Sequence, residues 1–190
     1  FGVHIAEVMS RAELLDAARM AEDLGYDVFG CSDHLNSQLT PMVALAFAAA
    51  VTSTIELQPL VLANDFRHPV VMAREAATLD LLSQGRFSLG LGAGWLGSEF
   101  HAAGIEFHRP PVRIARVAEA IAIFKGLQTG EPFDFQGKHF QVTAMQGEPR
   151  PARSPIPLLV AGSGPVMLSL AARTADTVAL NPGLPISAGR

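Results

Sequence analysis

The chain has 190 residues, which is the size of a single domain. Apolar residues make up 49% of it and charged residues 17%, a composition that excludes a disordered chain. The net charge is −4 without a basic run, and the single cysteine, Cys31, excludes a disulfide framework. The longest apolar stretch, Met42–Val51, is too short to span a membrane, and no signal peptide is visible. We therefore expect a cytoplasmic protein with neither a membrane nor a nucleic acid as partner.

Short apolar runs alternate with longer segments of helical periodicity, which predicts a parallel sheet built from β–α units. Strands are expected at residues 1–5, 27–31, 56–62, 87–91, 157–161 and 178–180. Helices are expected at residues 11–24, 41–52, 69–84 and 110–127, with a short helix between the last two strands. Ser10 and Glu13 form a capping-box pattern at the first helix, and prolines open the other three long ones.

The regular β–α spacing is interrupted once, between residues 91 and 157. The helix from residue 110 has one apolar face, and Arg113, Arg116 and Glu119 fall largely on its outer side. Residues 131–142 alternate apolar and polar around Gly137, which predicts an inserted β-hairpin. We expect residues 1–190 to form one domain. Six strands fit either a doubly wound sheet or a (β/α)₈ barrel that lacks its last two units and is incomplete at the C-terminus.

Functional residues of a parallel sheet gather where its strands end. Polar residues and glycines follow five of the predicted strands: Ser32-Asp33-His34, Asn64-Asp65 with Arg67-His68, Gly92-Ala93-Gly94-Trp95 with Ser98-Glu99, Gly162-Ser163-Gly164, and Asn181. One such group would carry little weight. Five groups at one edge of a sheet predict a shared pocket.

Two of these groups are rich in glycine. Gly92, Gly94 and Gly97 match a dinucleotide-binding pattern, but they follow the fourth strand rather than the first, so a tight turn beside a ligand is the better interpretation. Gly162-Ser163-Gly164 leads into a helix, whose N-terminal amides and positive dipole end suit a phosphate. An ordinary capped turn explains that segment equally well. Ser163 lacks the surroundings of a hydrolase nucleophile.

Asp33 and His34 place a carboxylate and an imidazole at one strand end. Imidazole suits proton transfer near neutral pH, although a turn aspartate beside an exposed histidine is the simpler explanation. Trp95, the only tryptophan, suits a pocket wall or a core position. Because no paired-histidine motif occurs, we expect no metal site.

Several segments, in this order along the chain, resemble the bacterial luciferase-like monooxygenase superfamily. They are Phe1-Gly-Val-His-Ile5, Ser32-Asp33-His34, Val61-Leu-Ala-Asn64, Phe66-Arg67-His68-Pro69, Gly85-Arg86-Phe87 through Trp95, Glu99-Phe100, and Val160-Ala-Gly-Ser-Gly164. The resemblance implies a TIM barrel and an oxidoreductase that uses either FMN or the deazaflavin coenzyme F420. Ser32-Asp33-His34 is most similar to the F420-dependent branch.

The resemblance further implies roles for single residues. His34 would contact the deazaflavin and assist catalysis, with Asp33 and Trp95 completing the catalytic site. Leu60, Val61, Asn64, Ala93, Gly94, Gly162, Ser163 and Gly164 would bind the cofactor. A non-prolyl cis peptide would lie at Leu60–Val61. We also expect a homodimer.

Trp95 stands where the sugar-phosphate dehydrogenases of this branch have an acidic glutamate, so sugar-phosphate oxidation is not expected. Hydride transfer between F420 and an unidentified small organic substrate is the favoured function. The alternatives are an FMN-dependent monooxygenase, a non-catalytic flavin- or deazaflavin-binding protein, and an unrelated barrel that binds a phosphorylated metabolite.

Overall fold

A computed structural model describes residues 1–7, 9–36 and 39–180 of the chain. The described strands are β1 (Gly2–Ile5), β2 (Val28–Cys31), β3 (Glu56–Pro59), β4 (Leu62–Ala63), β5 (Leu89–Gly92), β6 (Phe133–Gln136), β7 (Gln141–Met145), β8 (Leu158–Ala161) and β9 (Thr177–Ala179). The helices are α1 (Arg11–Asp23), α2 (Pro41–Ala49), η1 (Asn64–Phe66), α3 (Pro69–Leu82), α4 (Gly97–Ala103), α5 (Pro110–Leu127) and α6 (Pro165–Thr174).

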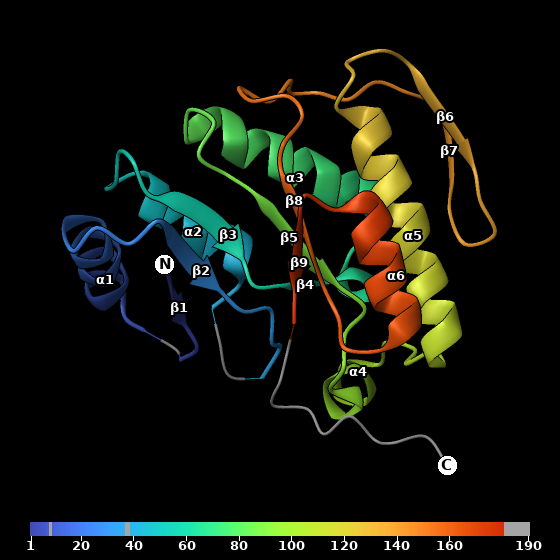
Figure 1. The fold of residues 1–190 in the computed structure, drawn as a ribbon, viewed down its shortest axis with the longest axis horizontal. Helices are drawn as coiled ribbons and strands as arrows, with labels where there is room; N and C mark the ends of the chain where they lie inside the picture. Colours follow the sequence, from blue (N-terminus) through green and yellow to red (C-terminus); the bar gives the residue numbers. More distant parts are fainter. Residues whose placement is uncertain (8, 37–38, 181–190) are drawn as a thin grey trace.

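The parallel strands follow one another in space in the order of the sequence. One sheet has the order β1-β2-β3 and the other β4-β5-β8-β9, with a parallel bridge from Leu57 to Phe87 between them. A doubly wound sheet would reverse its strand order at one point, and this chain shows no reversal among its described strands. The order is therefore that of consecutive units of a β/α barrel, with β1 and β9 at the two open ends of the row (Figure 1).

The strand expected at residues 56–62 is two strands in the structure. β3 pairs with β2, whereas β4 pairs with β5, and the backbone between them passes through a cis peptide at Leu60–Val61. The cis peptide inferred from the family resemblance is thus confirmed. Because of this break, the first half of the expected strand pairs with β2 and the second half pairs with β5.

Local signals placed the helix starts well. Ser10 and Glu13 form the reciprocal capping box of α1, and prolines open α2, α3, α5 and α6. The short helix α4 was not predicted, because its seven residues are too few to show a period. None of the described helices combines the length and the apolar character needed to cross a membrane.

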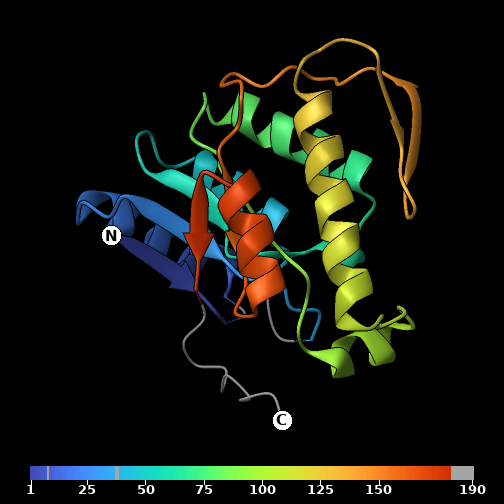
Figure 2. The ribbon, with the colours of Figure 1, turned by 45° about the vertical axis from the view of Figure 1, so that its right-hand side comes forward.

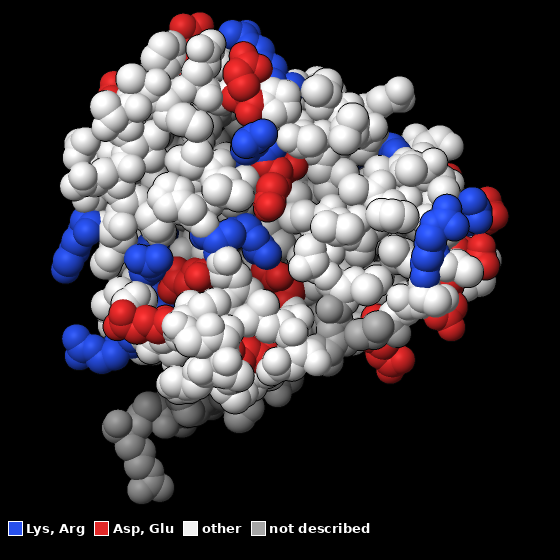
Figure 3. Space-filling view, turned by 180° about the vertical axis from the view of Figure 1, so that it is seen from behind, with Lys and Arg blue, Asp and Glu red and all other residues white. Residues whose placement is uncertain are grey.

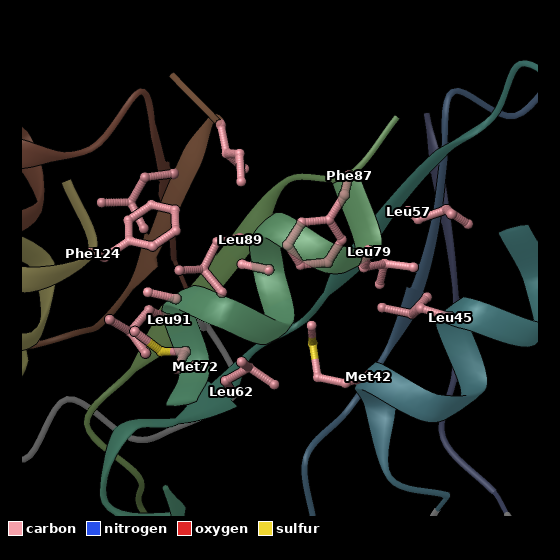
Figure 4. Packing of buried hydrophobic residues seen from close by; sticks show 14 of the residues in the cluster. Met42, Leu45, Leu57, Leu62, Met72, Leu79, Phe87, Leu89, Leu91 and Phe124 are labelled. Carbon is pink, nitrogen blue, oxygen red and sulfur yellow. The ribbon is translucent and has the colours of Figure 1, made fainter. Parts of the chain in front are cut away.

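The core lies between the strands and the helices that cover them. Figure 4 shows Leu57, Phe87, Leu89 and Leu91 of the sheets packed against residues from α2, α3 and α5. Each of these four side chains is fully buried. The site residues described below lie at the carboxyl ends of the strands, next to this core.

The hairpin β6–β7 is confirmed and lies against α5, away from the sheets (Figure 2). Glu119 of α5 accepts hydrogen bonds from the backbone amides of Lys138, His139 and Phe140, each at 2.9 Å. The Arg116 guanidinium lies over the Phe140 ring and binds Asp65. Glu119 thus lies on the outer side of α5 as expected, where the hairpin covers it, whereas Arg116 also reaches η1 through Asp65.

The surface reflects the low content of charged residues. On the face opposite to that of Figure 1, acidic and basic side chains lie next to one another and most of the surface is uncharged (Figure 3). No extended basic area is visible on that face.

Candidate active site

A cavity of about 670 Å³ opens where β1, β2, β4, β5, β8 and β9 end. Its volume falls within the range of cofactor and substrate sites. The predicted site residues on its wall are Asp33, His34, Leu60, Val61, Ala93, Gly94, Trp95, Gly162, Ser163 and Gly164. The structure thus brings together residues that are up to about 130 positions apart in the sequence, as expected for the carboxyl edge of a parallel sheet.

Asn64 is the one predicted site residue that does not line this cavity. Its side chain is buried and donates a hydrogen bond to Asp65 Oδ1 at 2.9 Å, while Arg116 binds the same oxygen. Asp65 therefore joins η1 to α5, and Asn64 supports the carboxylate that does so. Asn181, which follows the last predicted strand, lies outside the described residues.

Asp33 is a buried anchor at the end of β2. Its carboxylate accepts two hydrogen bonds from Arg67, at 2.7 and 3.1 Å, and one from the Ala63 amide at 3.0 Å. These bonds tie the end of β2 to the end of β4. With its oxygens already bound, Asp33 is suited to hold the loop rather than to move a proton.

His34 follows directly and is held by a buried glutamate. Its Nδ1 lies 2.6 Å from Glu99 Oε1, and the backbone amide of Leu35 donates to Glu99 Oε2 at 3.2 Å. Glu99 comes from α4, the helix that was not predicted. Sequence analysis noted Glu99 as a polar residue near a strand end, but a separation of 65 positions along the chain gave no sign of its partner.

Trp95 stands at the mouth of the cavity with 56% of its surface exposed. Its ring meets the His34 ring edge-on, with the centroids 5.8 Å apart. Gly94, just before it, has a φ of +71°, and a Cβ there would come within 2.7 Å of the Phe100 ring. A glycine is needed at that turn for both reasons.

His4, which looked isolated in the sequence, lines the same cavity and its Nε2 contacts Ser32 Oγ. Burial, and then the charge of His34, lower the pKa of His4. Alternate residues of a strand lie on the same face, so His4 lies on the same face of β1 as Gly2. This spacing was the one signal in the sequence for the side on which His4 lies.

Arg113 is a second cavity residue whose role was missed. Its guanidinium donates to the carbonyls of His108, Ala93 and Gly94 and lies over the Phe107 ring. Burial lowers its pKa, and the charge of Asp65 opposes that effect. Arg113 fixes the Ala93-Gly94 turn from below.

The segment from Gly162 to Gly164 leads into α6 as predicted, with Gly164 as the N-cap and Pro165 as the first helical residue. The Gly162 amide is already bound to the Ala179 carbonyl at 3.1 Å. Among the described residues, the amides of Ser163 and Gly164 have no acceptor, and both residues are exposed at the cavity. An anion at this helix start would be bound by these two amides and not by that of Gly162.

No group of three His, Cys, Asp or Glu side chains among the described residues is placed to hold a metal ion. The site consists instead of an imidazole held by a carboxylate, an aromatic wall and free amides at a helix N-terminus. This set can exchange a proton with a ligand and bind an anionic group at the other end of the cavity.

Known proteins with similar sequences include F420-dependent enzymes. The chain is 33% identical over 180 residues to the F420-dependent glucose-6-phosphate dehydrogenase of Amycolatopsis mediterranei, covering 90% of this chain and 54% of the relative. It is 31% identical over 185 residues to the 5,10-methylenetetrahydromethanopterin reductase of Archaeoglobus fulgidus, covering 97% and 54%. The chain thus spans about half the length of these relatives.

Solved structures show the same fold. The coenzyme F420 dependent tetrahydromethanopterin reductase from Methanopyrus kandleri matches with a TM-score of 0.88 and 27% identity, over 95% of this chain and 55% of that one. An F420-dependent secondary alcohol dehydrogenase in complex with an F420-acetone adduct matches with a TM-score of 0.85 and 25% identity, over 94% and 57%. The model of the luciferase-like monooxygenase family matches residues 2–190. The strand order, the cis peptide at Leu60–Val61 and these similarities agree, and the chain belongs to the luciferase-like monooxygenase family.

Proposed function

We propose that this protein is an oxidoreductase that transfers a hydride between coenzyme F420 and a small organic substrate. The observation that carries the proposal is the single cavity that holds His34 at one strand end and the free amides of Ser163 and Gly164 at another. The F420-dependent relatives support the choice of coenzyme. A homodimer and a cytoplasmic location belong to the same proposal.

The residues present fit a deazaflavin with its phosphate. The cavity has mostly apolar walls, including Leu60, Val61 and Ile114, against which a flat ring system can pack. The amides before α6 supply uncompensated donors for a phosphate. When bound, the coenzyme supplies the hydride chemistry, and the protein supplies orientation and charge.

In this proposal His34 handles the proton that accompanies hydride transfer to or from a carbonyl or hydroxyl group. An imidazole can donate or accept that proton near neutral pH. Asp33 holds the loop that carries His34, and Trp95 forms the wall on which the substrate rests. The edge-on contact of Trp95 with His34 brings the substrate wall and the imidazole next to each other.

The substrate class follows from the same wall. Trp95 is a large side chain at the cavity, and the family resemblance implies a glutamate at this position in the sugar-phosphate dehydrogenases. We propose a neutral alcohol or carbonyl compound as substrate and not a sugar phosphate. Glucose 6-phosphate is therefore the informative negative control in a substrate screen.

Coenzyme titration tests the proposal. Gly164 has a φ of −89°, and no atom lies within 4 Å of a Cβ added there, so both alanine and aspartate fit without strain. Gly164→Asp places a negative charge beside the phosphate and should abolish F420 binding, while Gly164→Ala should retain it. Equal affinity in both variants would place the phosphate elsewhere.

The same titration separates the alternatives. Tighter binding of FMN than of F420 would favour the FMN-dependent monooxygenase. Binding of F420 without turnover of any alcohol or carbonyl compound would favour a non-catalytic binding protein. Binding of neither coenzyme would overturn the proposed function.

A further inference from the structure

The His34 ring has its two nitrogens in different surroundings. Nδ1 lies 2.6 Å from a carboxylate oxygen of Glu99, whose side chain is only 4% exposed. Among the described residues Nε2 has no hydrogen-bond partner, and the side chain of His34 lines the cavity. One nitrogen is thus committed to the protein and the other is free for a ligand.

The direction of the hydrogen bond follows from the second oxygen of Glu99. The backbone N–H of Leu35 can only donate, so Glu99 Oε2 must accept. An ionised carboxylate has no hydrogen to donate, so the Glu99 carboxylate can only accept at Oε1 as well. His34 Nδ1 therefore carries the hydrogen.

We propose that Glu99 is a positioning residue that locks His34 in the Nδ1–H tautomer and presents a bare Nε2 to the cavity. Glu99 also lines the cavity, and its role in this proposal is to act through His34. The inference rests on the proposed function for its consequence, because a bare Nε2 is the atom that would accept the proton during hydride transfer. The placement of the hydrogen does not depend on that function.

Glu99 also explains why α4 and the loop after β2 lie together. Its two oxygens bind the imidazole of His34 and the next amide along the chain, so a single carboxylate orients both the ring and its backbone. Trp95 packs edge-on against the ring from the loop before α4 and opposes rotation of the side chain. When His34 takes up a proton at Nε2, the carboxylate balances the resulting charge.

Nitrogen-15 NMR of the histidine rings tests the proposal without coenzyme or substrate. The signal of His34 is assigned by its loss in His34→Gln. The protein should show His34 as the Nδ1–H tautomer. In Glu99→Met, which has no oxygen to accept, the ring should shift towards the Nε2–H tautomer.

If Glu99→Met does not fold, Glu99→Gln provides a second test. Glu99→Gln offers one acceptor oxygen for two donors, so His34 should show a mixture of tautomers. Glu106→Gln is the matched control, because Glu106 lies 2.9 Å from His108 Nδ1 at an exposed position outside the cavity. It should leave the His34 signal unchanged.

Kinetics add a second measurement, because a purely structural role of Glu99 would not lower kcat while leaving coenzyme affinity unchanged. Glu99→Gln should lower kcat about 10- to 100-fold, as for other residues that orient an imidazole, with coenzyme affinity within about twofold. A native His34 found as the Nε2–H tautomer, or an unchanged tautomer in both Glu99 variants, would overturn the inference. A locked Nδ1–H tautomer without F420 binding would instead overturn only the proposed function.

Discussion

The carboxylate of Asp33 and the guanidinium of Arg67 form a two-pronged ion pair, with Nη1–Oδ2 and Nη2–Oδ1 distances of 2.7 and 3.1 Å. The Asp33 side chain is 5% exposed and that of Arg67 16%. The pair joins the end of β2 to the segment after η1, so it sets the position of the loop that carries His34. Its geometry gives Asp33 a structural role in the loop that carries His34.

Removing one member of this pair should cost more than removing both. Asp33→Ala leaves a buried guanidinium without its carboxylate and should lower the free energy of unfolding by about 3–5 kcal/mol. Asp33→Ala combined with Arg67→Met should recover part of that loss, because the guanidinium is then no longer left without the Asp33 carboxylate. The recovery is only partial, because Glu75 Oε2 lies 3.9 Å from Arg67 Nε and loses this cation in the double variant. Urea denaturation of the single and double variants measures the difference. Equal losses in the two would show that the pair contributes little beyond the bond to Ala63.

Sequence analysis located the strands and most helices because their signals are local. Ser10 and Glu13, three residues apart, are enough to predict a helix start. The polar strand ends could be grouped into one pocket because parallel strands share an edge. The position of the cis peptide came from the family resemblance alone, since no local pattern marks Leu60 and Val61.

The contacts inside the site could not be predicted in the same way. The pairs Asp33–Arg67 and His34–Glu99 are 34 and 65 residues apart, and each depends on how separate β–α units pack. Arg116 is not free on the surface of α5, because the Phe140 ring of the hairpin packs against its guanidinium and Asp65 of η1 binds it. Helical periodicity predicts a face, but it does not predict what a later segment places against that face.

Replacements of His34 and Trp95 should change different kinetic constants. His34→Ala removes the group that we propose handles the proton, and it should lower kcat by about 10²–10⁴-fold with a smaller change in coenzyme affinity. Trp95→Ala should mainly raise KM, because we propose that the substrate packs against Trp95. Steady-state kinetics with F420 and the best substrate from the screen measure both. Full activity of His34→Ala would remove that residue from the mechanism.

Trp95 also provides a direct reading of coenzyme binding. It is the only tryptophan of the chain and lines the cavity, so its emission should be quenched when F420 enters. The quenching should disappear in Gly164→Asp and persist in Gly164→Ala. Quenching that survives in Gly164→Asp would contradict a phosphate site at the start of α6.

The single thiol should be inert in the folded protein. Cys31 is 1% exposed at the end of β2, and burial, followed by the charge of Asp33, raises its pKa to about 11. Since the thiolate is the reactive form, alkylation by iodoacetamide at pH 8 should be slow in buffer and fast in urea. Mass spectrometry counts the modified thiol. Rapid labelling in buffer would show that the end of β2 opens readily.

Glu22 should make the stability of the fold depend on pH in the acid range. Its carboxylate, at the end of α1, accepts hydrogen bonds from the amides of Ser53, Thr54 and Ile55 at 2.6–3.1 Å. Burial alone would raise the pKa of Glu22, but these hydrogen bonds outweigh it and lower the pKa from 4.5 to about 2. The bonds hold the loop before β3 against α1.

The lowered pKa fixes the sign of the effect. Between pH 4.5 and about 2 the unfolded chain binds a proton at Glu22 that the folded chain does not, so stability falls as the pH falls through this window. Above pH 4.5 the contribution is complete. Glu22→Gln should lower the free energy of unfolding at pH 7 by about 1 kcal/mol, given the solvent around the group, and should flatten its decline below pH 4.5.

Urea denaturation at a series of pH values between 7 and 3 measures that decline. Glu131→Gln is the control, because its side chain is exposed and has no hydrogen-bond partner among the described residues. This variant should have the same free energy of unfolding at pH 7 as the parent protein, and the same decline below pH 4.5. If Glu22→Gln and Glu131→Gln lose stability in parallel as the pH falls, the three amides do not favour the ionised carboxylate, and the link between α1 and β3 must come from packing alone.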